Sequence, residues 1–287
     1  MLQHLLTGLS FGSLYALLGL GLVLTLRSTN VLNFAQGEIA MLMAFVTYQI
    51  VATLHWPIVA SIGASLVCAA LLGAALYNII FYPMRKRLHD GQSLVALSLK
   101  LAITGLVALY WTAESRVFPK VFDAESYSVF GALISAGQFW TIITGAICLA
   151  AVGLFLRFTD IGLSMRVAAE NADVAQLLGV NLRMVGTLAW MAAACIGALT
   201  GVLLASNVYL SPFMMGLVIM KAFAALVVGG MTSVLGVVAG GLLLGLTESL
   251  VAYAFTPLMQ ESVGLLFIIV VLLIRPQGLF GGAVRRA

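Results

Sequence analysis

The sequence predicts an all-α membrane protein with about nine transmembrane or re-entrant helices, in one membrane domain over residues 1–287. Three observations support this fold class. Hydrophobic residues make up 62% of the chain and charged residues only 8%, whereas charged residues are about a quarter of a soluble domain. The apolar runs are long and unbroken, unlike the alternating strands of a membrane barrel. The 29 glycines would let helices approach closely in lipid.

Nine apolar runs are candidates for membrane-spanning helices, because about 20 apolar residues cross a bilayer as a helix. Polar or helix-breaking residues at 55–57, 206–212 and 229–233 mark turns between adjacent runs that have no charge between them. The seventh and the last runs are the shortest or least regular and could be broken or re-entrant, so eight to ten crossings fit the sequence. The runs cover residues 5–26, 39–54, 58–81, 93–112, 139–156, 184–205, 214–230, 234–253 and 257–274.

Lysine and arginine in the loops predict the orientation, because they are enriched on the cytoplasmic side. With nine spans, three basic groups fall on one side and the amino terminus lies outside. We therefore expect residues 83–92, 157–183 and 275–287 in the cytoplasm and the long loop 113–137 outside. The basic residues are Arg85, Lys86, Arg87, Arg157, Arg166, Arg183, Arg275, Arg285 and Arg286.

Patterns typical of catalysis or metal binding do not emerge from the sequence. None of the lysines follows a phosphate-binding G-x-x-x-x-G motif. The histidines His4, His55 and His89 are scattered and form no ligand cluster, and the cysteines lie inside apolar runs without metal spacing. We expect a protein that is not an enzyme, binds no metal or cofactor of its own and does not bind nucleic acid. If it pumps a solute, another protein supplies the energy.

A polar stretch interrupts the apolar sequence between the first two runs. Residues 28–38 read STNVLNFAQGE and include Asn33, Gln36, Gly37 and Glu38. Irregular, polar backbone at membrane depth is tolerated only where it is buried in protein or lines a watery cavity. Two interpretations are open: a cytoplasmic turn, or a discontinuous helix that lines a solute path. We favour the path and take these four residues as its candidates.

Other charges lie in or beside apolar runs. A charge at the bilayer centre costs roughly 3 kcal/mol, so each needs a compensating environment. Glu38 and Glu248 fit a solute path and an interfacial or paired structural position equally well, whereas the long stems of Lys100 and Lys221 favour the second explanation. The glycine pair at 229 and 230 would also break a helix. The candidates for a path or a structural role are Lys221, Gly229, Gly230 and Glu248.

One charged, amphipathic segment lies between the fifth and sixth runs. Residues 164–178 predict a helix that ends at Gly179, with N-terminal caps available at Thr159, Asp160 and Ser164. The helix would lie in the lipid interface or dock on another protein. We favour docking, because its apolar face is rich in alanine and its acids balance its bases. Arg166, Glu170 and Asp173 would share one face, and the other would carry Met165, Ala168, Ala172 and Ala175.

Four stretches of the chain are distinctive: NVLNFAQGEIAMLMAF, TDIGLSMRVAAENADVAQLLGVN, LVIMKAFAALVVGG and LIRPQGLFG. Together they resemble the LivH-type permease subunit of branched-chain amino-acid ABC importers, over almost the whole chain and in the same order. The stretch SLKLAITG around Lys100 departs from the more neutral pattern of such permeases. Permeases for urea and other small amides look similar. Branched-chain amino acids are therefore the first expectation for the solute, and other amino acids and urea follow.

The resemblance implies a permease in the bacterial inner membrane that moves its solute into the cytoplasm. It implies a second, LivM-like permease, two ATPases (LivG-like and LivF-like) that hold ATP–Mg, and a periplasmic substrate-binding protein. Residues 164–179, within the loop 157–183, would be the coupling helix that rests on an ATPase. A stand-alone secondary transporter or channel for small amino acids or urea is the alternative, and it would need no ATPase. The coupling residues would be Arg166, Glu170, Asn171, Asp173 and Gly179.

Overall fold

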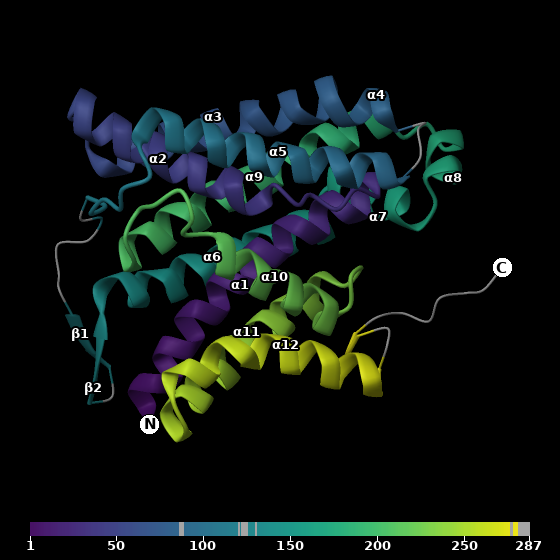
Figure 1. Cartoon of the computed structure of the whole chain (residues 1–287). Coiled ribbons are helices and arrows are strands. Elements are labelled where there is room, and N and C mark those ends of the chain that lie inside the picture. The colour runs from purple at the N-terminus through teal and green to yellow at the C-terminus, as the bar shows by residue number, and fades with distance from the viewer. Residues whose placement is uncertain (86–88, 120, 122–125, 130, 276–277, 281–287) are drawn as a thin grey trace. The chain divides into compact units, whose positions relative to one another are not determined.

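The computed structural model describes residues 1–85, 89–119, 121, 126–129, 131–275 and 278–280. In this part of the chain, seven helices are long and apolar enough to cross a membrane, which confirms an all-α polytopic membrane protein (Figure 1). Lys86, Arg87, Arg285 and Arg286, which entered the prediction of orientation, lie outside the described residues.

Each of the nine apolar runs lies on a helix. The long helices are α1 (Leu2–Thr29), α2 (Gln36–Leu54), α3 (Ile58–Ala75) with its continuation through the π-helix η1 (Leu76–Phe81) and α4 (Tyr82–Met84), α5 (His89–Trp111), α6 (Ala136–Phe158), α9 (Leu182–Asn207) and α11 (Val234–Ala254). The seventh and last runs form the shorter apolar helices, α10 (Gly216–Gly229) and α12 (Pro257–Ile274). The number of crossings and the side of the amino terminus stay predictions.

The described residues belong to two compact units, and α1 and α6 each contribute to both. The first unit takes the described parts of Met1–Val23, Lys120–Leu149 and Leu217–Ala287, and the second takes Leu24–Pro119 and Ala150–Gly216. The single membrane domain stays a prediction.

In the first unit, α1 packs closely on α11, and α11 packs on α12. Glycine makes the first contact possible. A Cβ atom added to Gly245 would lie 2.4 Å from the Cα atom of Gly12, and one added to Gly241 would lie 2.6 Å from the backbone nitrogen of Ala16. Contacts this short leave no room for a side chain, so the small residues set the separation of the two helices. The same unit holds an antiparallel hairpin of β1 (Ser126–Val129) and β2 (Ala132–Ser135) in the predicted outside loop.

In the second unit, α9 is the central helix. It packs on α2 and α3, while α5 packs on α2. Trp190 of α9 is 1% exposed and stacks on Phe81 of η1, with ring centroids 4.4 Å apart. Two short helices, α7 (Asp160–Glu170) and α8 (Ala172–Leu177), also pack on α9. The polar connection before α2 and the charged segment before α9 therefore both contact the central helix α9.

Candidate functional site

The polar connection between α1 and α2 folds into a closed network of amides. Asn33 and Gln36 are 1% and 0% exposed. Asn33 Nδ2 donates to Gln36 Oε1 at 3.1 Å, while Asn33 Oδ1 accepts from the backbone nitrogen of Ala35. Gln36 Nε2 donates to the carbonyl oxygen of Ala193 on α9 at 2.8 Å. The break is therefore buried in protein and hydrogen-bonded, which meets the condition for polar backbone at membrane depth.

A close approach from α9 completes this site. A Cβ atom added to Gly197 would lie 3.1 Å from Gln36 Nε2, and one added to Gly201 would lie 2.0 Å from the carbonyl oxygen of Ala40. These two glycines were not among the predicted site residues, and their only signal in the sequence is a spacing of four residues, which places both on one face of α9. Gly37, one of the four path candidates, is buried beside Gln36.

Glu38, on the first turn of α2, is paired with a lysine of α5. Glu38 Oε1 lies 3.5 Å from Lys100 Nζ, with 6% of the Glu38 side chain and 34% of the Lys100 side chain exposed. Glu38 Oε2 has no hydrogen-bond partner among the described residues. Of the two explanations for Lys100, the structure therefore supports pairing. The spare oxygen leaves Glu38 with acceptor capacity beside the amide network.

The first unit holds a second, more buried ion pair. Lys221 Nζ of α10 lies 2.9 Å from Glu248 Oε2 of α11, with 14% and 1% of the side chains exposed. Tyr15 of α1 donates its hydroxyl to the same carboxylate oxygen at 2.9 Å. Gly264 of α12 faces the pair, since its added Cβ atom would lie 3.8 Å from Glu248 Oε1. Lys221 and Glu248 thus compensate each other, and Tyr15, which the sequence analysis missed, adds a third helix.

Gly229 and Gly230 form the expected helix break. The helix α10 ends at Gly229, and Gly230 has a φ of 98° that favours glycine. Ser233 then caps α11 by accepting a hydrogen bond from the backbone nitrogen of Gly236 at 3.0 Å. A Cβ atom on Gly229 would lie 2.2 Å from the Gly236 carbonyl, so the turn is tight. Its relation to a solute path stays a prediction.

The charged segment is two helices, so the single helix expected over residues 164–178 is wrong. Asn171 is extended, with φ −157° and ψ 108°, and separates α7 from α8. Its Oδ1 atom accepts from the backbone nitrogens of Asp173 and Val174, both at 3.0 Å. This cap begins a new helix instead of continuing the old one, because an asparagine side chain competes with the backbone for the free amides.

Both ends of the segment follow the predicted capping chemistry. Of the three proposed caps, Thr159 begins α7, and its Oγ1 atom accepts from the backbone nitrogen of Gly162 at 3.0 Å. Gly179 has a φ of 85°. The backbone nitrogen of Val180 donates to the Ala175 carbonyl oxygen at 3.0 Å, as in a glycine-terminated helix end.

The alanine-rich face of the segment packs inside the chain. Met165, Ala168 and Ala175 are buried against Val185 and Ala189 of α9, while Ala172 is exposed. This face is therefore not available to a partner, in contrast to the docking face that the sequence suggested.

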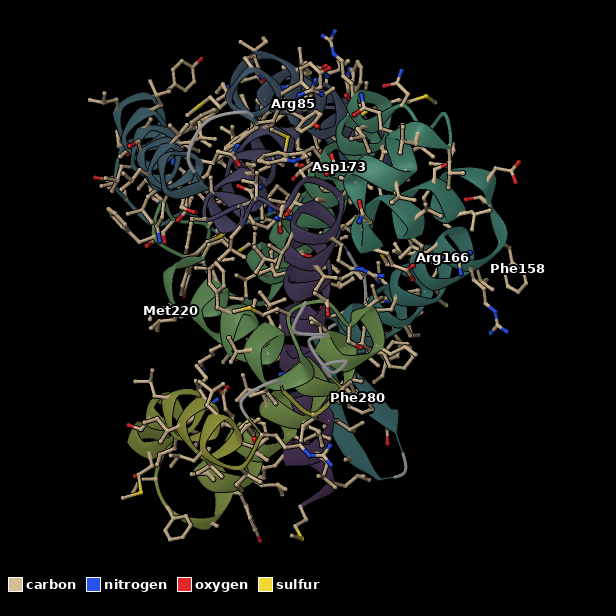
Figure 2. The ribbon with its side chains drawn as sticks, turned by 90° about the vertical axis from the view of Figure 1, so that its right-hand side faces the viewer. Arg85, Phe158, Arg166, Asp173, Met220 and Phe280 are labelled. Carbon is tan, nitrogen blue, oxygen red and sulfur yellow. The ribbon has the colours of Figure 1, made fainter. Side chains whose placement is uncertain are left out.

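The outer face of the segment carries charged and leucine side chains. Arg166 and Asp173 lie on α7 and α8 (Figure 2). Leu177 and Leu178 are 87% and 71% exposed. These leucines were not among the predicted coupling residues, although a Leu-Leu pair directly before the terminating glycine is a visible signal in the sequence. The predicted coupling residues Arg166, Glu170, Asn171, Asp173 and Gly179 are all exposed.

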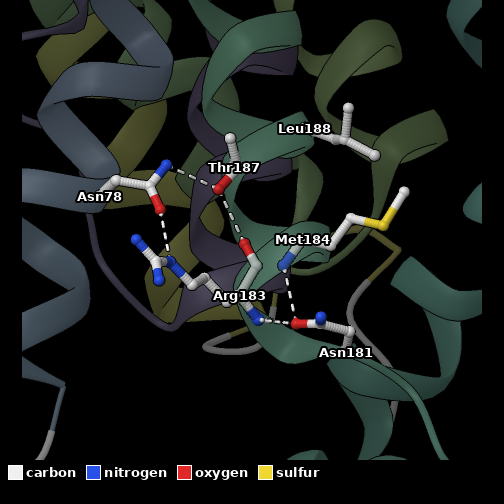
Figure 3. A pocket seen from close by; sticks show the side chains of 6 residues that line it. All are labelled: Asn78, Asn181, Arg183, Met184, Thr187 and Leu188. Carbon is white, nitrogen blue, oxygen red and sulfur yellow. Dashed lines mark hydrogen bonds between the residues drawn. The ribbon is translucent and has the colours of Figure 1, made fainter.

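Two arginines lie near the end of this segment, one directly after α4 and one on the first turn of α9. The guanidinium carbons of Arg85 and Arg183 lie 4.2 and 4.9 Å from the ring centroid of Tyr82. Arg183 also lines an open pocket of about 350 Å³ with Asn78, Asn181, Met184, Thr187 and Leu188 (Figure 3). The start of the basic loop after α3 and the end of the 157–183 loop therefore meet, as expected if both lie on one side of the membrane.

Comparison with known proteins shows similarity over nearly the full length. Residues 4–274 match the model of a family described as branched-chain amino acid transport system / permease component. The chain is 30% identical to the high-affinity branched-chain amino acid transport system permease protein LivH of Escherichia coli (strain K12), over 98% of this chain and 95% of that protein. It is 28% identical to BraD of Pseudomonas aeruginosa, with the same coverage, and 28% identical to a probable LivH of Methanocaldococcus jannaschii, over 94% of this chain and 90% of that protein. No solved structure matches.

Proposed function

This chain belongs to the family of permease components of branched-chain amino-acid transport systems, and we propose that it is the membrane-spanning permease of an ATP-driven importer. Its solute would be a branched-chain or related amino acid, carried into the cytoplasm. The observation that carries this proposal is the family match over residues 4–274, a stretch that includes six of the seven long apolar helices and all but the first two residues of α1.

The complete importer would contain further subunits. We propose a second, LivM-like permease, LivG-like and LivF-like ATPases that bind ATP–Mg, and a periplasmic substrate-binding protein. This chain would be the non-catalytic part, and the absence of a phosphate-binding lysine motif from its sequence supports that division of labour. It would lie in the bacterial inner membrane with its amino terminus outside.

The segment 157–183 is our candidate for the ATPase-coupling surface. Its outward residues, Arg166, Glu170, Asn171 and Asp173, are exposed. Its inner face packs on α9 through Met165, Ala168 and Ala175, which contact Val185 and Ala189. Because packed side chains transmit displacement, a push on α7 and α8 would move α9. Gln36 is hydrogen-bonded to the same helix, so the displacement would reach the polar break before α2.

The polar break is our candidate for the border of the solute route. Asn33, Gln36, Gly37 and Glu38 are buried at the start of a membrane-spanning helix. The amides of Asn33 and Gln36 would meet the solute when α9 shifts, because their present hydrogen bonds close on each other and on that helix. The Glu38 carboxylate, which is paired with Lys100 of α5, would lie beside them. For Lys221, Gly229, Gly230 and Glu248 we propose a structural role, since the two charges pair with each other and the glycines form a turn.

Reconstitution into vesicles tests the function. The full chain, with its second permease, ATPases and cognate binding protein, should accumulate leucine only when ATP is supplied on the ATPase side. Urea and a basic amino acid serve as comparison solutes. Leucine flux through the chain alone, at the same rate and without ATP, would instead support a channel or secondary transporter. Impermeant labelling of single cysteines in loops 113–137 and 157–183 tests the orientation, which requires opposite sides.

A further inference from the structure

Arg183, on the first turn of α9, is held in place by a side-chain network. Its Nε atom donates to Asn78 Oδ1 at 2.7 Å. Asn78 Nδ2 in turn donates to Thr187 Oγ1 at 2.9 Å, and Thr187 donates to the backbone carbonyl of Arg183 at 2.8 Å (Figure 3). The two terminal nitrogens of Arg183 make no hydrogen bond to the residues that the structure describes. An arginine fixed through Nε, with its terminal donors free, is prepared to bind a tetrahedral or planar anion.

A second arginine converges on the same place. Arg85 and Arg183 both lie over the ring of Tyr82, at 4.2 and 4.9 Å from its centroid. Two like charges that contact one ring repel each other, and a bound anion would offset that repulsion. The six residues that line the pocket include none with an acidic side chain.

Exposed apolar side chains follow or precede the pocket residues along their helices. Ile79, next to Asn78, is 74% exposed, and Met184, next to Arg183, is 54% exposed. Leu71, further along α3, is 64% exposed. Leu71 and Ile79 lie on the candidate membrane span Ile58–Met84, and Met184 lies on the candidate span Leu182–Asn207. Arg85 directly follows the end of the first span, and Arg183 lies on the first turn of the second. An exposed apolar helix surface that ends in a pair of arginines is the pattern expected at the level of lipid headgroups.

We propose that Arg183, Arg85 and the pocket beside Asn78 bind the phosphate of an anionic phospholipid headgroup, with an acyl chain along the exposed apolar surface of α3. A protein carboxylate would also complement the charges. The lipid fits better because exposed apolar side chains lie on the same helices and because the two arginines lie at the ends of two candidate membrane spans. The bound headgroup would hold the end of α3 against the start of α9, beside the segment 157–183.

Native mass spectrometry of the full chain in detergent tests this proposal, by titration with phosphatidylglycerol and, separately, phosphatidylcholine. An arginine in contact with the headgroup contributes about 1 kcal/mol, or roughly five-fold in affinity, so Arg183→Gln and Arg85→Gln should each weaken phosphatidylglycerol binding by that factor. Asn78→Asp keeps the arginines but places a negative charge beside one, and it should weaken binding as well. Arg157→Gln is the matched control, because Arg157 is an exposed arginine at the end of another candidate span, α6, and because its guanidinium lies over Phe158 and does not line the pocket.

The expected result is tight binding of phosphatidylglycerol by the wild type and by Arg157→Gln, with no comparable binding of phosphatidylcholine. Equal affinity in Arg183→Gln, Arg85→Gln and Arg157→Gln would overturn the site. If millimolar inorganic phosphate displaces bound phosphatidylglycerol as fully as added phosphatidylglycerol does, the site binds a soluble anion instead of a lipid. Unchanged lipid binding in Arg183→Gln, together with lost co-purification of an ATPase, would assign these arginines to a protein contact. Arg85 is exposed, so Arg85→Gln keeps the test valid if Arg183→Gln misfolds.

Discussion

Gln36 donates its side-chain amide to the backbone carbonyl oxygen of Ala193 at 2.8 Å, which ties the first turn of α2 to the middle of α9. The two residues are 157 positions apart in the chain. Through this bond, the helix that supports the charged segment also contacts the polar break. The relationship makes Gln36 the most informative single residue in the candidate route.

Replacing Gln36 with leucine should destabilise the protein. The change removes the bond to Ala193 and leaves Asn33 Nδ2 without its acceptor, and an unsatisfied buried donor costs about 1–3 kcal/mol. Thr53→Ala is the control, because Thr53 is exposed and its hydroxyl bonds only to its own helix. Thermal unfolding in detergent measures both. A Gln36→Leu variant that melts with the wild type would show that the amide network is not a structural link.

Gly245→Ala should separate α1 from α11. The new methyl carbon would lie 2.4 Å from the Cα atom and nitrogen of Gly12, which are backbone atoms that cannot rotate away. Overpacking of this kind costs about 1–3 kcal/mol. Gly63→Ala is the control, since nothing lies within 4 Å of that position, and alanine there should be neutral or stabilising by up to about 1 kcal/mol. If the two variants have the same thermal stability, the close helix contact is incorrect.

A double-mutant cycle should show that Lys221 and Glu248 stabilise each other. Lys221→Met leaves a carboxylate that is 1% exposed without its cation, and breaking a buried pair costs about 3–5 kcal/mol. The double variant Lys221→Met with Glu248→Gln removes both charges and should be less destabilised than the sum of the single variants. Additive losses of thermal stability would mean that the two side chains act independently. Tyr15→Phe should also lower the thermal stability, since it removes one hydrogen bond to the Glu248 carboxylate.

The outer face of α7 and α8 should matter for coupling and little for folding. A triple alanine variant of Arg166, Glu170 and Asp173 changes only exposed side chains, so each change should alter stability by less than about 0.5 kcal/mol. It should nevertheless weaken ATPase association or uncouple ATP hydrolysis from uptake in vesicles. Solute capture by the binding protein should be unchanged. Normal assembly, stimulated hydrolysis and uptake in this variant would refute the coupling role.

Gly179→Val should impair coupling more than the triple variant, because it affects the shape of the segment. Gly179 has a φ of 85°, which a β-branched residue resists. Its strain should loosen α8 at the bond from Val180 to Ala175. Leu177→Ser is a suitable control for this loosening, since the leucine is 87% exposed and lies just before this helix end. Proteolysis of the purified chain would report the loosening, and it should affect Gly179→Val only.

Single cysteines should reveal whether the polar break meets water. After Cys68, Cys148 and Cys195 are replaced, cysteines at 33, 36 and 38 should react with small water-soluble thiol reagents during ATP-driven turnover. All three positions are at most 5% exposed in the structure, so reaction requires the movement that we propose for α9. Complete protection of all three in every nucleotide state would indicate a dry structural turn.

Part of this architecture depends on local chemistry and could therefore be predicted from the sequence. The nine apolar runs predict helices because backbone amides inside a bilayer must be satisfied within each segment, and each run does lie on a helix. The caps at Thr159 and Gly179 were also predictable, since each acts on residues at most five positions away. The candidate residues Asn33, Gln36 and Glu38 stood out because polar groups are rare in such runs.

Contacts between residues far apart in the sequence could not be predicted in this way. Lys100 pairs with Glu38, and Tyr15 and Lys221 converge on Glu248, because helix packing brings together residues far apart in sequence. The choice of which face of α7 is buried likewise depends on α9, so periodicity identified the alanine face but not its partner. At Asn171, a helical pattern and a capping side chain competed, and the packed segment holds the capped form. Each of these outcomes depends on the free energy of packing one element on another, which has no counterpart in the order of residues alone.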